Sequence, residues 1–214
     1  MSGSLRVTEI FRSLQGESTR AGFPCAFIRL TGCSLRCVWC DTAYAFHGGE
    51  EMSVEDAVRE VLSLSTDLVE VTGGEPLEQA AVHDLIARLL DEGKTVLLET
   101  GGHVGLERVD PRVVKIVDVK APGSGMQHAN LAENLESLSA KDEVKFVLAD
   151  RRDFDWSLDF VAARDLDRRH CVTFSPVWGS LPAEELAAWI RDSGRRIRLG
   201  LQLHKLLWGD VPGR

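Results

Sequence analysis

The sequence TGCSLRCVWC, residues 31–40, places Cys33, Cys37 and Cys40 in a C-x3-C-x2-C arrangement, in a chain of 214 residues with five cysteines in all. Cysteines scattered at random would give roughly 0.003 such arrangements in a chain of this length, so the spacing calls for a chemical explanation. A [4Fe–4S] cluster normally takes four thiolates. Three cysteines would therefore leave one iron open to a ligand from outside the protein.

Two other interpretations of the cysteines stay open at this point. A structural zinc site needs four ligands, and His47, seven residues after Cys40, would complete a Cys3His set. Alternatively, the three thiols would simply be buried in the core. The two remaining cysteines, Cys25 and Cys171, lie in or beside apolar stretches, and we expect both to be small buried hydrophobic residues. The odd number of cysteines argues against a disulfide framework.

On either side of the cysteine loop, short apolar segments alternate with segments of helical periodicity. Helical stripes begin near Val54, Val82 and Leu186, and glycines end the last two. The expected strands are Leu5–Phe11, Ala26–Leu30, Leu68–Thr72, Thr95–Glu99, Val113–Val119, Glu143–Leu148, Val172–Ser175 and Ile197–Leu203. Strands that alternate with helices predict an α/β fold with a mostly parallel sheet. Eight complete units usually need about 250 residues, so we expect a shortened, incomplete (β/α) barrel that forms a single domain over residues 1–214.

Polar and glycine-rich motifs follow the expected strands. Ligands of parallel α/β proteins bind at the carboxyl ends of the strands, so these motifs predict one shared site on one rim. The motifs are Leu14–Glu17, Thr31–Cys33, Thr72–Pro76, Glu99–Gly102, Asp118–Pro122, Phe174–Ser180 and Gln202–Lys205.

Composition excludes several classes of protein. The hydrophobic set makes up 44% of the residues and charged residues 27%, which excludes a disordered or low-complexity chain. The net charge of −8 argues against a general nucleic-acid binder. No apolar run approaches the roughly 20 residues of a membrane span, and the N-terminus lacks the layout of a signal peptide. We therefore expect a cytoplasmic protein without a membrane or nucleic-acid partner, and a homodimer by base rate.

Two motifs together resemble those of the radical S-adenosylmethionine (SAM) superfamily. The first is the cysteine motif, with the aromatic Trp39 directly before Cys40, and the second is T72-G-G-E-P76 after the next expected strand. The resemblance implies a [4Fe–4S] cluster whose open iron is chelated by SAM. It also implies an external reductant such as flavodoxin or ferredoxin, and a protein that places a radical and excludes water.

Further motifs resemble the 7-carboxy-7-deazaguanine synthase family over nearly the whole chain. They are F11-R-S-L-Q-G-E17, Arg29, C40-D-T42 and Q202-L-H-K205. The resemblance implies a lyase that contracts the ring of 6-carboxy-5,6,7,8-tetrahydropterin to 7-carboxy-7-deazaguanine with loss of ammonia. The product leads to queuosine and other 7-deazapurines. Mg²⁺ assists this reaction, and SAM is regenerated.

The same resemblance assigns roles to individual residues. The cluster ligands are Cys33, Cys37 and Cys40, and the Mg²⁺ ligand is Thr42. The SAM-binding residues are Trp39, Asp41, Gly74, Glu75, Lys120, Ser175, Pro176, Val177 and Trp178. The substrate-binding residues are Leu14, Gln15, Gly16, Glu17, Arg29, Thr72 and His204. A glycine at position 74 would let SAM approach the backbone, and the planar fork of Arg29 suits the substrate carboxylate.

Several features leave other readings open. The chain departs from the family pattern at Asp118-Val-Lys120, where Ser-Pro-Lys is frequent, and in the extension 206–214 after the His-Lys pair. Arg29 could be a surface residue, Thr42 a cap, Trp39 a packing residue and Glu99 a solvated carboxylate. Two rival functions also remain. One is a radical SAM activating enzyme that installs a glycyl radical on a partner protein, and the other is a non-catalytic zinc or electron-transfer module.

Overall fold

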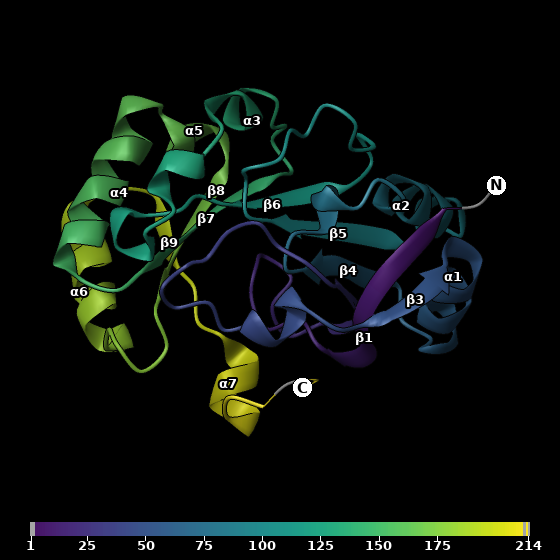
Figure 1. The fold of residues 1–214 in the computed structure, drawn as a ribbon. Helices are drawn as coiled ribbons and strands as arrows, with labels where there is room; N and C mark the ends of the chain where they lie inside the picture. The colour runs from purple at the N-terminus through teal and green to yellow at the C-terminus, as the bar shows by residue number, and fades with distance from the viewer. Residues whose placement is uncertain (1–2, 212, 214) are drawn as a thin grey trace.

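The computed structural model describes residues 3–211 and 213, and these form one curved sheet of nine strands with helices on its outer side (Figure 1). The strand order is β3-β1-β2-β4-β5-β6-β7-β8-β9. The strands are β1 Ser4–Leu14, β2 Pro24–Leu30, β3 Glu50–Ser53, β4 Leu68–Gly73, β5 Thr95–Thr100, β6 Val114–Asp118, β7 Glu143–Leu148, β8 Cys171–Pro176 and β9 Ile197–Leu199. The helices are α1 Val54–Ser63, α2 Val82–Asp91, α3 Ala132–Glu136, α4 Arg151–Ala163, α5 Leu166–Arg169, α6 Ala183–Ser193 and α7 Leu203–Trp208.

Every strand pair from β2 to β9 is parallel, which confirms the expected sheet of mostly parallel strands. The sheet stays open, because its edges are β3 and β9, and this confirms the incomplete barrel. Short 3-10 helices cover Ala43–Phe46, Pro76–Glu78, Pro122–Ser124 and Gln127–Ala129. Within the described residues, no helix is both long and apolar enough to cross a membrane.

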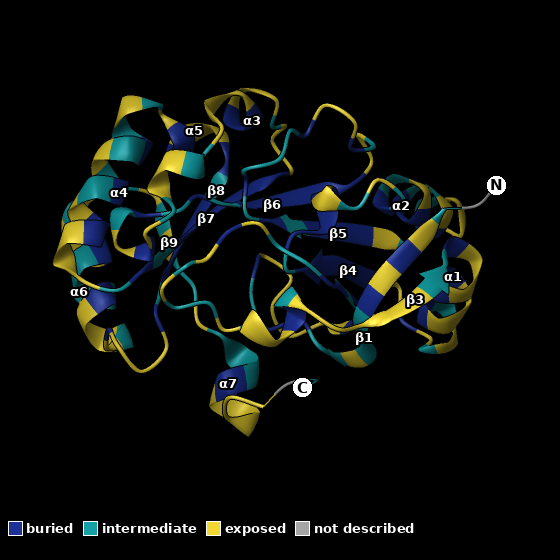
Figure 2. Ribbon diagram, viewed as in Figure 1, coloured by how far each residue is buried: buried dark blue, intermediate teal, exposed yellow. Residues whose placement is uncertain are grey.

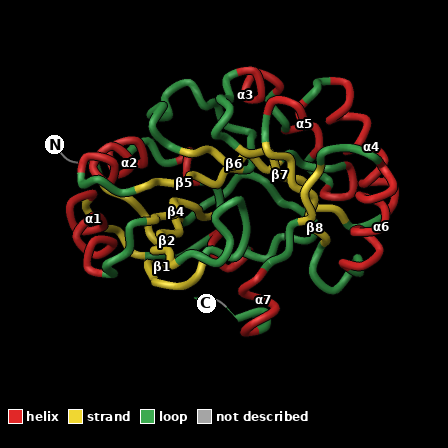
Figure 3. The backbone as a smooth tube through the Cα atoms, turned by 180° about the vertical axis from the view of Figure 1, so that it is seen from behind, coloured by secondary structure: helices red, strands yellow, loops and turns green. Residues whose placement is uncertain are grey.

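The outer face of the sheet carries the main hydrophobic core. Residues such as Val69, Val71 and Leu98 point outward from their strands and pack against Leu85 and Leu89 of α2. The central strands such as β4, β6 and β7 are mostly dark blue in Figure 2, whereas the edge strand β3 and much of β1 are yellow or teal. In the view from behind, the helices other than α7 lie outside the curved sheet, and loops lie on its concave side (Figure 3). Burial of this apolar surface fixes which side of each strand faces inward.

Some elements were not predicted from the sequence, and others differ from the predicted bounds. The amphipathic pattern of α4 was not recognised, although Asp150 caps the helix by accepting a hydrogen bond from the Asp153 amide at 2.9 Å. The short edge strand β3 and the helices α3, α5 and α7 were also missed. The last strand is shorter than predicted, because it ends at Leu199 and the chain then turns into α7.

The strand β1 runs antiparallel to β2, with Leu14 opposite Pro24. Leu14–Glu17 therefore lies at the amino end of the parallel strands, and the prediction that this motif shares the carboxyl rim is wrong. The direction of a strand depends on which strand it pairs with, and an apolar segment does not encode that direction.

Candidate active site

The concave side of the sheet encloses one cavity of about 740 Å³ that runs from the cysteine loop to the segment after β1. Residues from all seven polar motifs line this one cavity, although one motif reaches it from the opposite end. The cavity lining includes every site residue expected from the sequence except Glu75. These residues are Leu14, Gln15, Gly16, Glu17, Arg29, Cys33, Cys37, Trp39, Cys40, Asp41, Thr42, Thr72, Gly74, Lys120, Ser175, Pro176, Val177, Trp178 and His204.

The cysteine loop follows β2 and is tied to its surroundings by main-chain hydrogen bonds. Gly32, at φ +100°, donates to the Ala45 carbonyl at 2.8 Å, and Val38 donates to the Ser124 carbonyl at 3.1 Å. All three thiols are half-buried and line the same cavity. Burial raises the pKa of Cys33 to about 11, so positive charge is needed to draw out the thiolate. Iron supplies such charge, and the donor set therefore fits an iron–sulfur cluster.

His47, the proposed fourth ligand of a zinc site, is not among the residues that line this cavity. Within residues 3–211 and 213, no three His, Cys, Asp or Glu side chains are arranged to hold a single ion. Of the other cysteines, Cys25 is fully buried, as expected, whereas Cys171 at the start of β8 is half-buried and only partly fits the prediction.

Gly74 has a packing role that the sequence did not reveal. A Cβ atom at this position would lie 2.2 Å from the Gly32 carbonyl oxygen and 2.8 Å from Cβ of Cys33. The main chain is joined to the loop as well, because Glu75 donates to the Gly32 carbonyl at 2.8 Å. The glycine therefore allows the end of β4 to pack directly against the cysteine loop.

Replacing Gly74 with alanine is expected to displace the cysteine loop, because neither backbone can yield freely. Overpacking of this kind costs about 1–3 kcal/mol in the free energy of unfolding. Thermal unfolding of the protein without iron, and iron content after anaerobic reconstitution, would measure the effect. A variant with unchanged stability and full iron content would show that the contact is unimportant.

The Glu75 side chain points away from the cavity. Its carboxylate is fully buried and accepts hydrogen bonds from the hydroxyl of Thr100 at 2.9 and 3.0 Å and from the amide of Gly101 at 2.8 Å. The carboxylate thereby fixes the end of β5. Any contact of Glu75 with SAM would come from its main chain.

The middle of the cavity carries a layer of polar side chains. Arg29 lies opposite Thr72 in the register of β2 and β4, and the Thr72 hydroxyl donates to Glu99 at 3.4 Å. The Arg29 guanidinium is held from behind by Glu9 at 2.8 Å, and Glu9 also accepts a hydrogen bond from the Tyr44 hydroxyl at 2.8 Å. Burial and the neighbouring Glu9 raise the pKa of Tyr44 to about 12, although Arg29 opposes this shift, so the phenol stays protonated.

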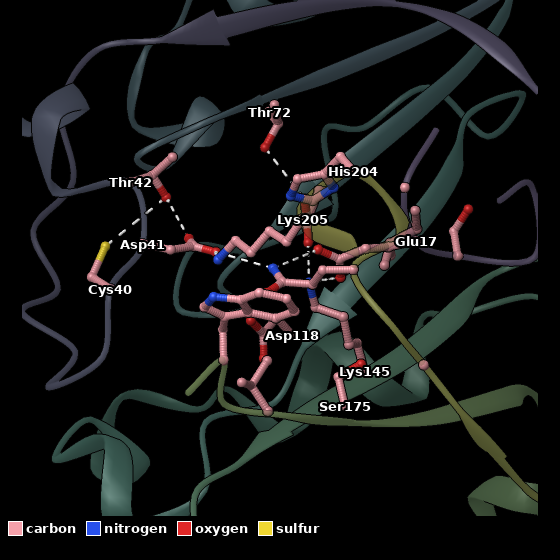
Figure 4. Close-up of a pocket in the computed structure, with 18 of the residues that line it drawn as sticks. Glu17, Cys40, Asp41, Thr42, Thr72, Asp118, Lys145, Ser175, His204 and Lys205 are labelled. Carbon is pink, nitrogen blue, oxygen red and sulfur yellow. Dashed lines mark hydrogen bonds and ion pairs between the residues drawn. The ribbon is translucent and has the colours of Figure 1, made fainter. Parts of the chain in front are cut away.

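Lys145 of β7 bridges two acidic side chains in the cavity. Its ammonium lies 2.9 Å from the carboxylate of Glu17 and also binds that of Glu99. Burial alone would lower the pKa of Lys145, but these two carboxylates raise it well above its usual value. Lys145 is therefore a permanent cation that joins the amino-end segment to the polar layer. Figure 4 shows it below Glu17.

The start of α7 joins the two ends of the site. The amide of Leu203 donates to the Gly16 carbonyl at 2.9 Å, and His204 packs so closely on Gly16 that a Cβ atom there would lie 2.2 Å from Nδ1. Lys205 is buried, and its ammonium lies 2.9 Å from Asp41, beside the cysteine loop (Figure 4). Although burial would raise the pKa of Asp41, Lys205 lowers it well below its usual value.

At the carboxyl edge, Lys120 lies 2.9 Å from Asp118, whose other oxygen is buried without a hydrogen-bond partner in the described part of the chain. Trp39 packs over Gly123, where a Cβ atom would lie 3.0 Å from the ring. Ser175 is buried, and Trp178 is 46% exposed at the mouth. These groups surround the space next to the cysteines.

Several charged residues of the site were not predicted from the sequence, among them Glu9, Glu70 and Lys145. Glu70 and Lys145 interrupt strands that are otherwise apolar, and both are more than 90% buried. A charged residue in a strand buried on both faces is the signal that would have found these two, since such a position is rarely charged unless it is paired.

Comparison with known proteins agrees with this geometry. The sequence model of the radical SAM superfamily matches residues 27–192. A protein of Koribacter versatilis named 7-carboxy-7-deazaguanine synthase is 43% identical over 95% of this chain and 97% of its own length. A protein of the same name from Chlorobaculum tepidum is 42% identical over 98% and 97%.

This chain belongs to the 7-carboxy-7-deazaguanine synthase family. The crystal structure of QueE from Escherichia coli has the same fold, with a TM-score of 0.75 over 94% of this chain and 95% of that one, at 24% identity. As a family member the protein is a radical SAM enzyme, whose cofactors are a [4Fe–4S] cluster and SAM. This membership rules out two earlier interpretations, a non-catalytic zinc module and three cysteines that are only buried structural thiols.

Proposed function

We propose that this protein converts 6-carboxy-5,6,7,8-tetrahydropterin to 7-carboxy-7-deazaguanine with loss of ammonia. The observation that carries the proposal is the 42–43% identity, over nearly the full length, to proteins named for that product. The cavity supports it, because cationic and acidic side chains converge there beside the cysteines. No comparable observation favours a glycyl-radical activating enzyme, the rival within the superfamily.

Cys33, Cys37 and Cys40 would hold the cluster, and SAM would complete it. When bound and reduced, the two supply a carbon radical that removes a hydrogen atom from the substrate. Lys120, the Ser175–Trp178 turn, Trp39 and the main chain of Gly74 and Glu75 would enclose SAM. All of these residues except Glu75 line the cavity, which supports this role. The Asp41 carboxylate binds Lys205 and Gln202, so in this role it would act by ordering the loop.

The chain's own residues would orient the substrate and exclude water. Arg29 would bind the substrate carboxylate, because Glu9 holds its fork within the cavity. Leu14, Gln15, Gly16 and Glu17 would meet the pterin from the amino end. Thr72 and His204 would add polar contacts. The amino end of the cavity is covered, since the segment after β1 is anchored by Thr19, whose hydroxyl and amide both donate to Glu143.

Thr42 would bind Mg²⁺ through its hydroxyl, which faces the cavity and lies 3.2 Å from Asp41. A cation with one protein ligand must be completed by water and substrate oxygens. Replacing Thr42 with valine is expected to remove the stimulation by Mg²⁺ and to leave the iron content unchanged. Steady-state rates with and without Mg²⁺ would measure this, and Thr42→Ser is the matched control that keeps the hydroxyl. Equal Mg²⁺ stimulation in the valine variant would contradict the role.

The test of the proposed function is anaerobic reconstitution with iron, sulfide, reductant and SAM, followed by addition of 6-carboxytetrahydropterin. We expect 7-carboxy-7-deazaguanine and ammonium in equal amounts. Release of 5′-deoxyadenosine without the deazaguanine would reject the substrate and leave the superfamily intact. A protein such as flavodoxin or ferredoxin would supply the electron in the cell, and turnover with each as sole reductant would identify the donor.

A further inference from the structure

A buried carboxyl group in the floor of the cavity has no role in the function proposed so far. Glu70 lies in the middle of β4, two residues before Thr72, and both side chains line the cavity. It is only 4% exposed. Its register partners are Phe27 on β2 and Leu97 on β5, so the neighbours of Glu70 in its own layer are apolar.

The floor around Glu70 is a small hydrophobic cluster on the inner side of the sheet. It consists of Cys25, Phe27, Leu68, Leu97, Val114 and Ile116, with Phe11 packed against it. A flat heterocycle can rest on such a surface, but a carboxyl group is costly to bury there unless it is hydrogen-bonded. Glu70 is therefore an unusual polar group within an apolar floor.

Within the protein, the Glu70 carboxyl group has a hydrogen-bond partner in Gln15. The Gln15 amide nitrogen donates to its Oε2 atom, and Glu70 also lines the cavity, from which a ligand can reach the carboxyl group. Burial, followed by the negative charge of Glu99, raises the pKa of Glu70 well above its usual value. The positive charge of Lys145 offsets only part of this rise in the pKa of Glu70, because the ammonium group is bound to Glu17 and Glu99. A ligand that donates an N–H group would complete the site.

The spacing of the strands places Glu70 at a suitable depth. Two residues along a strand span roughly 6.6 Å, so Glu70 lies about that far below the layer of Arg29 and Thr72. A carboxylated pterin carries its carboxylate at one end of the two fused rings and its 2-amino group at the other. With the carboxylate on Arg29, the 2-amino end points toward the floor.

From these observations we propose that Glu70 selects the substrate by accepting a hydrogen bond from the 2-amino group of the pterin, with Gln15 holding the carboxyl group in place. The inference rests on the proposed function and adds a specificity-determining residue to it. Hydrogen bonds from Gln15 and from the 2-amino group favour the charged carboxylate, which has no hydrogen to donate. A ring system with an oxygen in place of the 2-amino group would bring two acceptors together and be rejected.

The test compares two non-reacting ligands, 6-carboxypterin and 6-carboxylumazine, which has a 2-oxo group instead of the 2-amino group. Their dissociation constants are measured by fluorescence with the reconstituted enzyme and SAM. We expect the wild-type protein to prefer the pterin by at least about 10-fold, the lower limit for a hydrogen bond to a charged group. Glu70→Leu should weaken pterin binding by about 10- to 100-fold and abolish the preference. Glu70→Gln keeps an acceptor oxygen for the 2-amino group but adds an N–H donor for a 2-oxo group, so it should bind the pterin and lose most of the preference.

Asp142→Asn is the matched control, because Asp142 is also fully buried but is not among the residues that line the cavity, and its two oxygens accept hydrogen bonds from the amides of Lys115 and Ser139. Its preference between the ligands should equal that of the wild type. Equal loss of affinity for both ligands in Glu70→Leu, or an unchanged preference, would overturn the inference. If the wild-type protein bound 6-carboxypterin and 6-carboxylumazine equally well, the inference would also be overturned, and this measurement does not depend on whether Glu70→Leu folds. Failure of the wild type to convert 6-carboxytetrahydropterin would instead reject the proposed function.

Discussion

Replacement of Cys37 with alanine is expected to abolish retention of the iron–sulfur cluster and, with it, all cleavage of SAM. The thiol lies between the other two cysteines on one loop and lines the cavity with them, so two thiolates would remain for a cluster that needs three from the protein. Iron and sulfide content and the visible absorption spectrum after anaerobic reconstitution would measure the loss. We expect a colourless protein whose fold, followed by circular dichroism, is unchanged.

Cys171→Ser is the matched control, because this thiol lies at the start of β8 and is not among the residues that line the cavity. It should retain the full iron content and the full rate of SAM cleavage. A brown, SAM-cleaving Cys37→Ala protein would refute the assignment of the cluster ligands. Loss of the cluster in both variants would show instead that reconstitution depends on the stability of the whole chain.

Replacement of Arg29 with alanine is expected to leave the cluster intact and to weaken substrate binding by about 2–5 kcal/mol, because one partner of a buried charge pair is removed. The structure adds a reason for a large effect. Without Arg29, the Glu9 carboxylate that now holds the guanidinium at 2.8 Å would repel the substrate carboxylate. KM for the pterin should rise far more than kcat falls, and release of 5′-deoxyadenosine in the absence of substrate should be unaffected.

Arg29→Lys should recover only part of the affinity, since an ammonium group cannot reproduce the planar fork of the guanidinium. Arg12→Ala serves as the control on the neighbouring strand, because Arg12 is exposed and lies opposite Ala26, outside the cavity. If Arg29→Ala bound the substrate as tightly as Arg12→Ala, the carboxylate of the substrate would have to bind elsewhere in the cavity.

The cluster loop and the parallel sheet of this protein could be predicted from short sequence patterns. Three cysteines at fixed spacing, and a glycine-rich motif after the next strand, predict the cluster loop because all three of its protein ligands lie on one short segment. The alternation of apolar strands with amphipathic helices likewise predicted a parallel sheet. Both signals are local, since they depend on residues a few positions apart.

The tertiary structure alone decided how the distant parts of the site meet. The antiparallel pairing of β1 moved Gln15 and Glu17 to the amino end of the cavity, where Glu17 meets Lys145, 128 residues later in the chain. The close packing of Gly74 on Gly32 is equally invisible in the sequence. Strand direction, burial of single charges and contacts between loops depend on long-range pairing, and the free energy of that pairing is not encoded in any one segment.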